Sequence, residues 1–266
     1  MLGKSYSGVG RRLVLCRDNY RQFILLSHTE EVASALVSPG LVVASTTSSC
    51  LLVWRWRGRE VSSLGEGERY SLDTGLQLRL QADLLYILSR EGNILVFSLT
   101  LRRVTRQILP AQSPRFLTFQ IERGLLAGGS TDRHLYLLSL AENKVVHKLG
   151  GGGPPGAGWC LALSRPLLVS GGEGLVNVYH VRLGHLLHRL CPGPSPARLS
   201  CLQVWSGLVI AGDVRGNVLK WDLREEVVGE AVTLHTMTEA VRGLQLSSNN
   251  LTALAFDGDC LVWNFW

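Results

Sequence analysis

Apolar and polar residues alternate in short runs along the 266 residues of this chain, and small residues separate the runs. Residues 167–170, 208–211 and 217–221 are rich in aliphatic, β-branched or aromatic side chains beside glycines, the pattern typical of β-strands. Asp257-Gly258 separates two such runs, and this dipeptide is a strong hairpin signal because the turn needs a positive φ. No long helical periodicity accompanies them, so the pattern predicts an all-β chain.

The same unit recurs six times: an alternating run, a turn of small residues, and a second run that ends in a large residue. The copies span residues 41–55, 84–98, 124–139, 167–180, 207–222 and 250–264. Their large residues lie 41 to 43 positions apart and are Trp54, Phe97, Leu138, Tyr179, Trp221 and Trp263. Four-stranded propeller blades repeat every ~40–45 residues, whereas ankyrin and TPR repeats have periods of ~33–34. We therefore predict a β-propeller of four-stranded blades.

The fifth unit shows how one blade divides into strands. Residues 199–204, 208–212, 217–223 and 227–232 are predicted as its first to fourth strands. In such a blade the first strand is innermost and the fourth forms the outer edge. The outer strand is more polar in several units, as in residues 145–148.

Residues 211–222 resemble the signature between the second and third strands of the WD-repeat family, with Trp221-Asp222 as the dipeptide that names it. Residues 256–264 are similar, and residues 27–32 resemble the family's Gly-His turn into a first strand. The resemblance covers residues 11–266. It implies a single propeller domain over that range, preceded by an N-terminal tail at residues 1–10, and a role in binding other proteins.

The chain departs from the family pattern in most units. Only one unit keeps Trp-Asp, and the turn aspartate remains as Asp132 and Asp257 but is Glu91, Ser48 or Arg215 elsewhere. The family's His–Asp–Ser–Trp hydrogen-bond network is therefore expected to be incomplete in most blades. Stability should then depend mainly on apolar packing between blades.

The N-terminal segment adds an incomplete unit to the six full ones. Residues 12–16 are predicted as a further third strand, and residues 21–27 as a candidate for the outer position of the last blade. Two arrangements stay open: six closed blades with an extra strand, or seven blades of which the first has lost its inner strands. The second is favoured because members with seven blades are the commonest in the family.

Composition and charge narrow the functional classes. Hydrophobic residues make up 46% of the chain and charged residues 18%, which is enough for a sizeable core. The net charge of +6 is scattered, so it favours acidic or phosphorylated protein segments over nucleic acid as partners. Residues 1–10 hold no apolar stretch of signal-peptide length, and no segment approaches the ~20 apolar residues of a membrane span. We expect a cytoplasmic or nuclear protein that does not enter membranes.

Candidate chemical motifs are weak. Residues 151–156 match G-x-G-x-x-G, but two prolines intervene and a strand rather than a helix follows, which favours a loop between blades. His180, His185 and His188 are close in sequence, yet no carboxylate or cysteine completes a metal site, and solvated histidines are expected. The six cysteines form no C-x-x-C pair and are interpreted as buried thiols. No catalytic motif appears, so we expect no enzyme, cofactor or metal.

One surface remains as a candidate site. Aligning the units on residues 241–244 gives equivalent positions at the start of each first strand: Ala33, Leu76, Arg115, Trp159, Ser200 and Arg242. The turns between second and third strands, which lie on the same narrow face of a blade, add Arg90, Arg133 and Arg215. Arginine and tryptophan are favoured contact residues, and arginine binds carboxylates and phosphates in a bidentate manner. The predicted partner-binding residues are therefore Arg90, Arg115, Arg133, Trp159, Arg215 and Arg242; the alternative is that they are ordinary solvated loop residues.

Three functions follow from these observations. The first is a protein-interaction scaffold or adaptor that presents a partner within a larger complex, by resemblance to WD-repeat propellers. Substrate recognition for a ubiquitin ligase would fit this role if a longer product carried an F-box. The second is a nucleic-acid-associated module, suggested by the pI of about 9.2. An enzyme on a propeller scaffold comes last.

Overall fold

The computed structural model describes residues 6–9, 12–17, 22–27, 32–38, 40–55, 68–72, 77–108, 115–150, 160–172, 174–193, 197–225, 228–246 and 250–264. These ranges contain 26 β-strands and no helix, hence no helix that would cross a membrane. The strands form seven sheets, and within each sheet neighbouring strands follow one another along the chain and pair antiparallel. The chain divides into two compact units, Met1–Gln112 and Ser113–Trp266.

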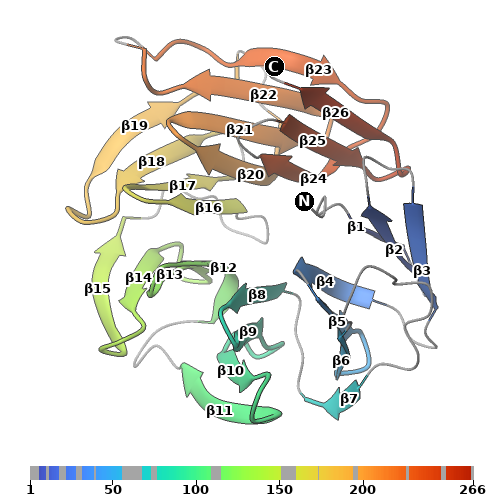
Figure 1. Ribbon diagram of the computed structural model, residues 1–266. Coiled ribbons are helices and arrows are strands. Elements are labelled where there is room, and N and C mark those ends of the chain that lie inside the picture. The colour runs from blue at the N-terminus through green and yellow to red at the C-terminus, as the bar shows by residue number, and fades with distance from the viewer. Residues whose placement is uncertain are drawn as a thin grey trace. The chain divides into compact units, whose positions relative to one another are not determined.

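The first unit holds one three-stranded sheet and two four-stranded blades (Figure 1). The N-terminal sheet consists of β1 (Tyr6–Val9), β2 (Arg12–Arg17) and β3 (Gln22–Ser27). Blade 1 consists of β4 (Val32–Ser38), β5 (Leu41–Thr46), β6 (Cys50–Arg55) and β7 (Glu68–Ser71). Blade 2 consists of β8 (Gln77–Gln81), β9 (Leu84–Leu88), β10 (Ile94–Ser98) and β11 (Arg103–Ile108).

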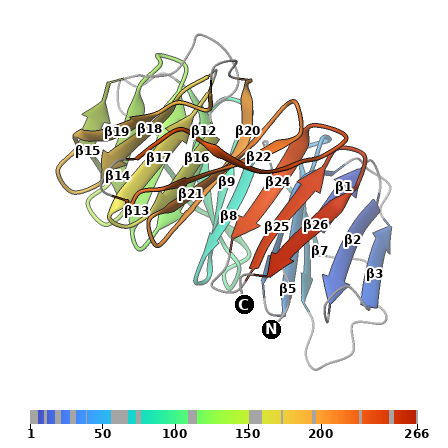
Figure 2. The same cartoon turned by 90° about the horizontal axis from the view of Figure 1, so that it is seen from above.

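The second unit holds three four-stranded blades and one three-stranded blade, and most of their strands are also labelled in Figure 2. Blade 3 consists of β12 (Phe116–Glu122), β13 (Leu125–Ser130), β14 (Leu135–Ser139) and β15 (Lys144–Leu149). Blade 4 consists of β16 (Cys160–Ser164), β17 (Leu167–Gly171), β18 (Val176–His180) and β19 (Leu186–Leu190). Blade 5 consists of β20 (Leu199–Trp205), β21 (Leu208–Asp213), β22 (Asn217–Asp222) and β23 (Val232–Thr236). Blade 6 consists of β24 (Val241–Leu246), β25 (Asn250–Ala255) and β26 (Cys260–Asn264).

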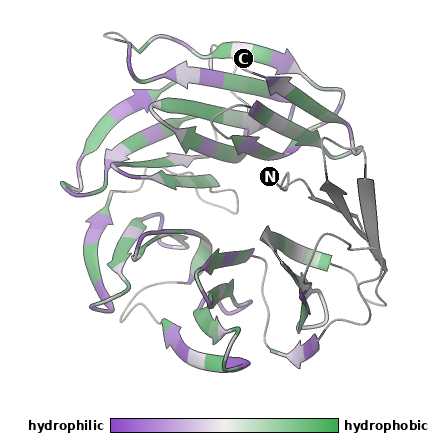
Figure 3. Ribbon diagram, in the orientation of Figure 1, coloured by the Kyte–Doolittle hydropathy of each residue, from purple (hydrophilic) through white to green (hydrophobic). Residues whose placement is uncertain are grey.

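The predicted propeller of four-stranded antiparallel blades is confirmed. The six repeats correspond to the second and third strands of blades 1 to 6, and all six large marker residues lie in third strands. Third strands such as β14 and β18 are almost wholly buried, whereas the outer strands β15 and β19 expose polar side chains. Figure 3 shows the hydropathy along these strands, with hydrophilic segments in β15. The pattern of apolar and polar residues in the sequence thus indicates which strands are covered on both faces.

Two strand predictions need correction. The fourth strand of blade 5 was expected at residues 227–232 but is β23, at Val232–Thr236. Val228 and Ala231 instead pack against the apolar core of blades 4 and 5, so the chain crosses that core before it joins the sheet. Residues 21–27, the candidate for the outer position of the last blade, form β3, which pairs with β2 in the N-terminal sheet. The third member of that sheet, β1, lies within residues 1–10, which the sequence analysis treats as a tail.

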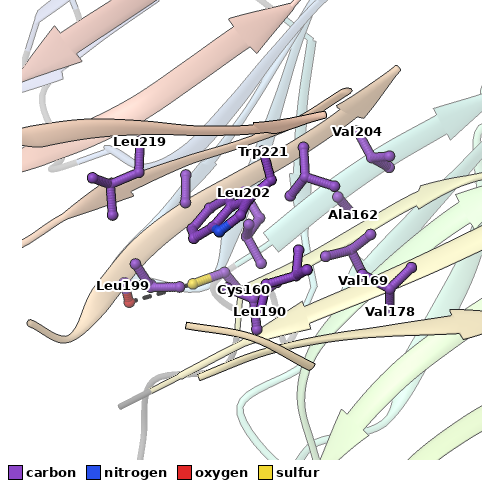
Figure 4. Close-up of a cluster of buried hydrophobic side chains, with 13 residues drawn as sticks. Cys160, Ala162, Val169, Val178, Leu190, Leu199, Leu202, Val204, Leu219 and Trp221 are labelled. Atoms are coloured by element: carbon purple, nitrogen blue, oxygen red, sulfur yellow. Dashed lines mark hydrogen bonds between the residues drawn. The ribbon is translucent and has the colours of Figure 1, made fainter. Parts of the chain in front are cut away.

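Apolar side chains from neighbouring blades share each core cluster. In the second unit, Val169 and Val178 of blade 4 pack with Leu202 and Trp221 of blade 5 (Figure 4). Trp221 is only 2% exposed, yet its indole N–H finds no acceptor among the residues that the structure describes. The tryptophan of the Trp-Asp pair therefore acts as an apolar core residue, as the incomplete network led us to expect.

Candidate interaction surface

The turns between second and third strands share one backbone geometry. In blades 3, 5 and 6 the N–H of the third loop residue donates to the carbonyl of the last residue of the second strand, at 3.1 to 3.2 Å. That third residue has a positive φ: +68° at Arg133, +88° at Gly216 and +97° at Gly258. The loop is thus a three-residue hairpin with a left-handed third position, for which glycine is best suited. The predicted equivalence of Asp132, Arg215 and Asp257 follows from this register.

Polar side chains hold these turns in different ways. In blade 3, Asp132 accepts hydrogen bonds from Ser130 Oγ at 2.6 Å, Tyr136 Oη at 2.5 Å and the His134 N–H at 3.1 Å. Although burial raises the pKa of Asp132, the hydrogen bonds from Ser130 and Tyr136 outweigh it, so this pKa lies well below its usual range. In blade 5, Asp213 is 3% exposed and accepts from the N–H groups of Arg215 and Asn217, each at 2.8 Å. Asp213 thereby fixes the loop that presents Arg215.

The predicted arginines occupy exposed positions. Arg133 and Arg215 lie in the turns of blades 3 and 5, Arg115 directly precedes β12, and Arg242 is the second residue of β24. In the first unit, Arg90 lies in the turn between β9 and β10, where its guanidinium donates to the carbonyl of Thr47. Trp159 lies outside the described residues, as do Leu76 and residues 151–156.

The register corrects the alignment of Arg115 with Arg242. A β-bulge interrupts the pairing of β12 with β13 at Leu117 and that of β24 with β25 at Arg242. Leu117 is therefore the equivalent of Arg242, and Arg115 is displaced by two residues. The true counterpart of Arg115 is Arg198: the carbonyl of each residue accepts from the first loop residue of its blade, Thr131 at 2.9 Å and Val214 at 3.0 Å. The predicted equivalence of Ser200 and Arg242 is consistent with this register.

Blades 5 and 6 are bound to each other next to these residues. Ser200 Oγ donates to the carbonyl of Val241 in blade 6, or to that of Gly212 at 3.1 Å in its own blade. Gly212 permits this approach, because a Cβ there would lie 2.5 Å from a methyl group of Val241. Gln203 Nε2 adds a hydrogen bond of 3.2 Å to the carbonyl of Leu244. These contacts hold β20 of blade 5 and β24 of blade 6 in a fixed arrangement around Ser200.

Five exposed residues form what we call the blade 5–6 patch: Arg198, Val214 and Arg215 from blade 5, with Arg242 and Phe256 from blade 6. Val214 and Phe256 occupy the same first loop position and are 46% and 58% exposed. The guanidinium of Arg242 lies over the Phe256 ring, 5.5 Å from its centroid, which is a cation–π geometry. Acidic Glu239, Asp257 and Asp259 border the patch on the blade 6 side.

The sequence analysis missed Arg198, Val214 and Phe256. Phe256 was noted only as part of the repeat signature. An aromatic residue directly before Asp257-Gly258 occupies the first loop position of a hairpin, where a side chain has no strand neighbour to cover it. That position was therefore the available signal for an exposed aromatic residue.

In the described ranges, Cys160 and Cys201 are shielded thiols and the histidines form no metal site. Burial raises the pKa of Cys160 to about 12 and that of Cys201 to about 11, so both thiols stay protonated at neutral pH. Cys191 and Cys260 are exposed, so the interpretation of the cysteines as buried thiols is wrong for these two. His180 and His185 stack at 6.0 Å, and His180 Nδ1 accepts the N–H of Leu183. Among the residues with described positions, no group of His, Cys, Asp and Glu is arranged to hold a metal.

Comparisons with known proteins identify the fold. No protein-family model matches the sequence, and no curated protein matches it. Among solved structures, a chain of the mitotic checkpoint complex aligns over 98% of this chain and 83% of its own, with 14% identity and a TM-score of 0.80. The computationally designed Ika8 protein aligns over 97% and 80%, with 22% identity and a TM-score of 0.74. BamB from Moraxella catarrhalis aligns over 98% and 82%, with 15% identity and a TM-score of 0.69. At these identities the shared feature is the fold.

Proposed function

We propose that this protein is a non-catalytic interaction scaffold of the WD-repeat type, cytoplasmic or nuclear, that holds a protein partner within a larger complex. The observation that carries the proposal is the blade 5–6 patch, which contains three exposed arginines and two exposed apolar side chains. One structure with the same fold is a chain of the mitotic checkpoint complex, a protein assembly. This supports a role in assembly at the level of the fold.

The patch is suited to an acidic or phosphorylated segment that also carries an apolar residue. Arginine guanidinium groups bind carboxylates and phosphates in a bidentate manner. Val214 and Phe256 offer exposed apolar surface in the same patch, and the stack with Arg242 keeps the Phe256 ring in place. Arginine and aromatic residues are the types that most often dominate binding energy at protein interfaces.

Affinity purification of the 266-residue protein with quantitative mass spectrometry, with and without nuclease, tests the proposal. We expect a set of protein partners that survives nuclease and is depleted at least about tenfold by the double variant Arg215→Glu/Arg242→Glu. The matched control is Arg182→Glu/Arg189→Glu, which makes the same charge change at exposed positions of blade 4. Full recovery of partners by the Arg215→Glu/Arg242→Glu protein contradicts the patch. Loss of all partners on nuclease treatment supports the nucleic-acid alternative instead.

A further inference from the structure

The turns of blades 5 and 6 carry opposite charges at the same position of the hairpin. The N–H groups of Gly216 and Gly258 donate to the last residues of β21 and β25, each at 3.2 Å. The residues that precede these glycines, Arg215 and Asp257, are therefore equivalent, and both are exposed. The charge next to the exposed apolar side chains thus changes sign from blade 5 to blade 6.

Asp257 is one of three exposed acidic residues that we call the border carboxylates: Glu239, Asp257 and Asp259. Thr238 Oγ1 donates to Asp257 Oδ2 at 2.7 Å and lies 3.5 Å from Asp259 Oδ2. The hydrogen bond from Thr238 lowers the pKa of Asp257, so this carboxyl group is ionised at neutral pH. Within the described part of the chain, none of the three has a lysine or arginine within ion-pair distance.

The segment between β23 and β24 connects the two turns of opposite charge. Its Met237 N–H donates to the carbonyl of Gly216, in the turn of blade 5, at 2.9 Å. A Cβ at Gly216 would clash with the carbonyl oxygens of Met237 and Glu239, so the segment passes directly over this turn. The residue between them, Thr238, binds Asp257 in the turn of blade 6. All these residues belong to the second unit, so the two charges are neighbours on one surface.

An exposed aromatic ring lies beside the border carboxylates. Phe256 directly precedes Asp257 and is 58% exposed. Its N–H donates to the carbonyl of Ala240, the residue after Glu239, at 3.1 Å. Lysine and arginine side chains can lay their alkyl chains on an aromatic ring while the charged end reaches an acidic group. This side of the blade 5–6 patch therefore suits a basic residue, whereas its arginines suit an acidic one.

We propose that the partner segment recognised by the blade 5–6 patch is bipolar. It carries an acidic or phosphorylated residue for the arginines of blade 5, an apolar residue for the two exposed apolar side chains, and a lysine or arginine for the border carboxylates. The residues concerned are Arg198 and Arg215, Val214 and Phe256, and the border carboxylates. This inference rests on the proposed function and adds the basic residue to it. The segment binds in one orientation, with its acidic end on blade 5 and its basic end on blade 6.

Partners with a single sign of charge match this surface less well. A segment that is acidic throughout meets the border carboxylates, and a segment that is basic throughout meets the arginines. Such contacts between like charges exclude wrong partners at protein interfaces. Nucleic acid is negative along its whole length, so the border carboxylates repel it as well. The mixed charges therefore select a protein segment that carries both signs.

Synthetic fluorescent peptides test the proposal, and their anisotropy with the 266-residue protein measures affinity. The bipolar peptides carry a glutamate pair and a lysine pair, separated by two, three or four apolar residues and made in both chain directions. Acidic and basic counterparts carry the same kind of charge at both ends. We expect a bipolar peptide to bind at least about tenfold more tightly than both of its counterparts, and this preference to decrease at high salt.

A charge-reversal variant tests the border carboxylates directly. Glu239→Lys/Asp259→Lys keeps Asp257, which accepts the Asp259 N–H of the turn. The preference for the bipolar over the acidic peptide should fall at least about tenfold in this variant. The matched control, Glu225→Lys/Glu230→Lys, makes the same charge change at exposed positions before β23 and should keep the preference. Melting curves establish that both variants are folded, and Glu239→Lys alone replaces the double variant if it is not.

Each outcome decides the proposal. Equal binding of the bipolar and acidic peptides by the parent protein overturns it, and so does tighter binding of the basic peptide. Absence of binding by every bipolar peptide, or an unchanged preference in Glu239→Lys/Asp259→Lys, also overturns it. Failure of the proposed function is a separate result, because it appears as full recovery of partners by the Arg215→Glu/Arg242→Glu protein in the affinity purification.

Discussion

The turn aspartate of blade 3 allows a quantitative test of how one polar residue stabilises a blade. Asp132 accepts three hydrogen bonds, and its donors Ser130 and Tyr136 are 0% and 5% exposed. Asp132→Ala leaves all three donors without this acceptor. With roughly 1 kcal/mol for each bond, and more for a charged acceptor, the free energy of unfolding should fall by about 3 kcal/mol. At about 2–4 °C per kcal/mol for a domain of this size, the melting temperature should fall by about 6–12 °C.

The matched control for Asp132 is Asp257→Ala in blade 6. Asp257 has the same place in its turn, and among the described residues its donors are Thr238 Oγ1 at 2.7 Å and the Asp259 N–H at 3.0 Å, both from exposed residues. Its removal should lower the melting temperature by roughly a third as much. Circular dichroism and tryptophan fluorescence, followed during heating and in urea, measure both variants. Equal losses for the two variants would refute the assignment of the effect to the buried donors.

The pKa of Asp132 adds a second, independent readout. Its pKa is lowered from an ordinary value of 3.8 in the folded protein, so the unfolded chain takes up a proton at this site first as the pH falls. The stabilisation by the ionised carboxylate is therefore complete above about pH 5 and is lost as the pH falls through 4 toward the folded pKa. The difference in stability between the parent protein and Asp132→Asn should narrow over this range. A difference that stays constant from pH 6 to pH 2.5 would contradict the reasoning.

Three further predictions concern single positions. Gly216→Ala should lower the melting temperature more than Gly258→Ala. Both glycines have a positive φ, but an added Cβ would clash with backbone carbonyl oxygens only at Gly216. Equal shifts of the melting temperature would argue against this reasoning. Trp221→Phe should lower the free energy of unfolding, measured in urea, by less than about 2 kcal/mol, because it removes an indole N–H that has no acceptor among the described residues. Trp221→Ala should lower it by about 3–5 kcal/mol, and similar losses for the two variants would contradict the apolar role. At pH 8 the exposed Cys191 of the folded protein should react with a thiol reagent, whereas the buried Cys160 should stay unmodified. Peptide mapping that finds Cys160 labelled before Cys191 would refute the burial of Cys160.

The period of the repeat was the part of the fold that the sequence could predict. A large residue such as Phe97 or Trp221 recurs in each unit because the third strand is covered on both faces and needs an apolar side chain there. The start of β23 could not be predicted from the sequence. Val228, in the segment before β23, packs on the apolar core as a strand residue would, but it does not pair in the sheet. Hydrophobicity alone does not distinguish an apolar residue of a paired strand from one in an unpaired segment that packs on the core.

The position of Arg115 shows the same limit at the candidate site. Side chains of a strand alternate with a period of two, so an alignment shifted by two residues preserves the apolar pattern. In β12 both Leu117 and Phe119 fit that pattern, but Leu117 is 36% exposed and Phe119 is 0% exposed. The bulge at Leu117 decides between the two registers, and a bulge leaves no fixed mark in the sequence. The arginines of the turns were found because their hairpins carry glycine or a carboxylate at fixed positions.

The departures from the WD-repeat signature have a structural reason in the turns. The last residue of the second strand, or the one that directly follows it, is polar and buried in four blades: Thr46, Ser89, Ser130 and Asp213, each at most 5% exposed. Each side-chain oxygen accepts a backbone N–H of the turn or of the next strand, at 2.8 to 3.3 Å. A buried N–H without an acceptor is costly, so each hairpin needs acceptors for the N–H groups of its turn. In blade 3 the loop aspartate Asp132 accepts the His134 N–H, whereas in blade 5 the equivalent N–H, that of Asn217, donates to Asp213 at the end of the second strand. The carboxylate at Asp213 thus takes over this role of the loop aspartate, which explains how Arg215 can occupy its position in the same blade that keeps Trp-Asp.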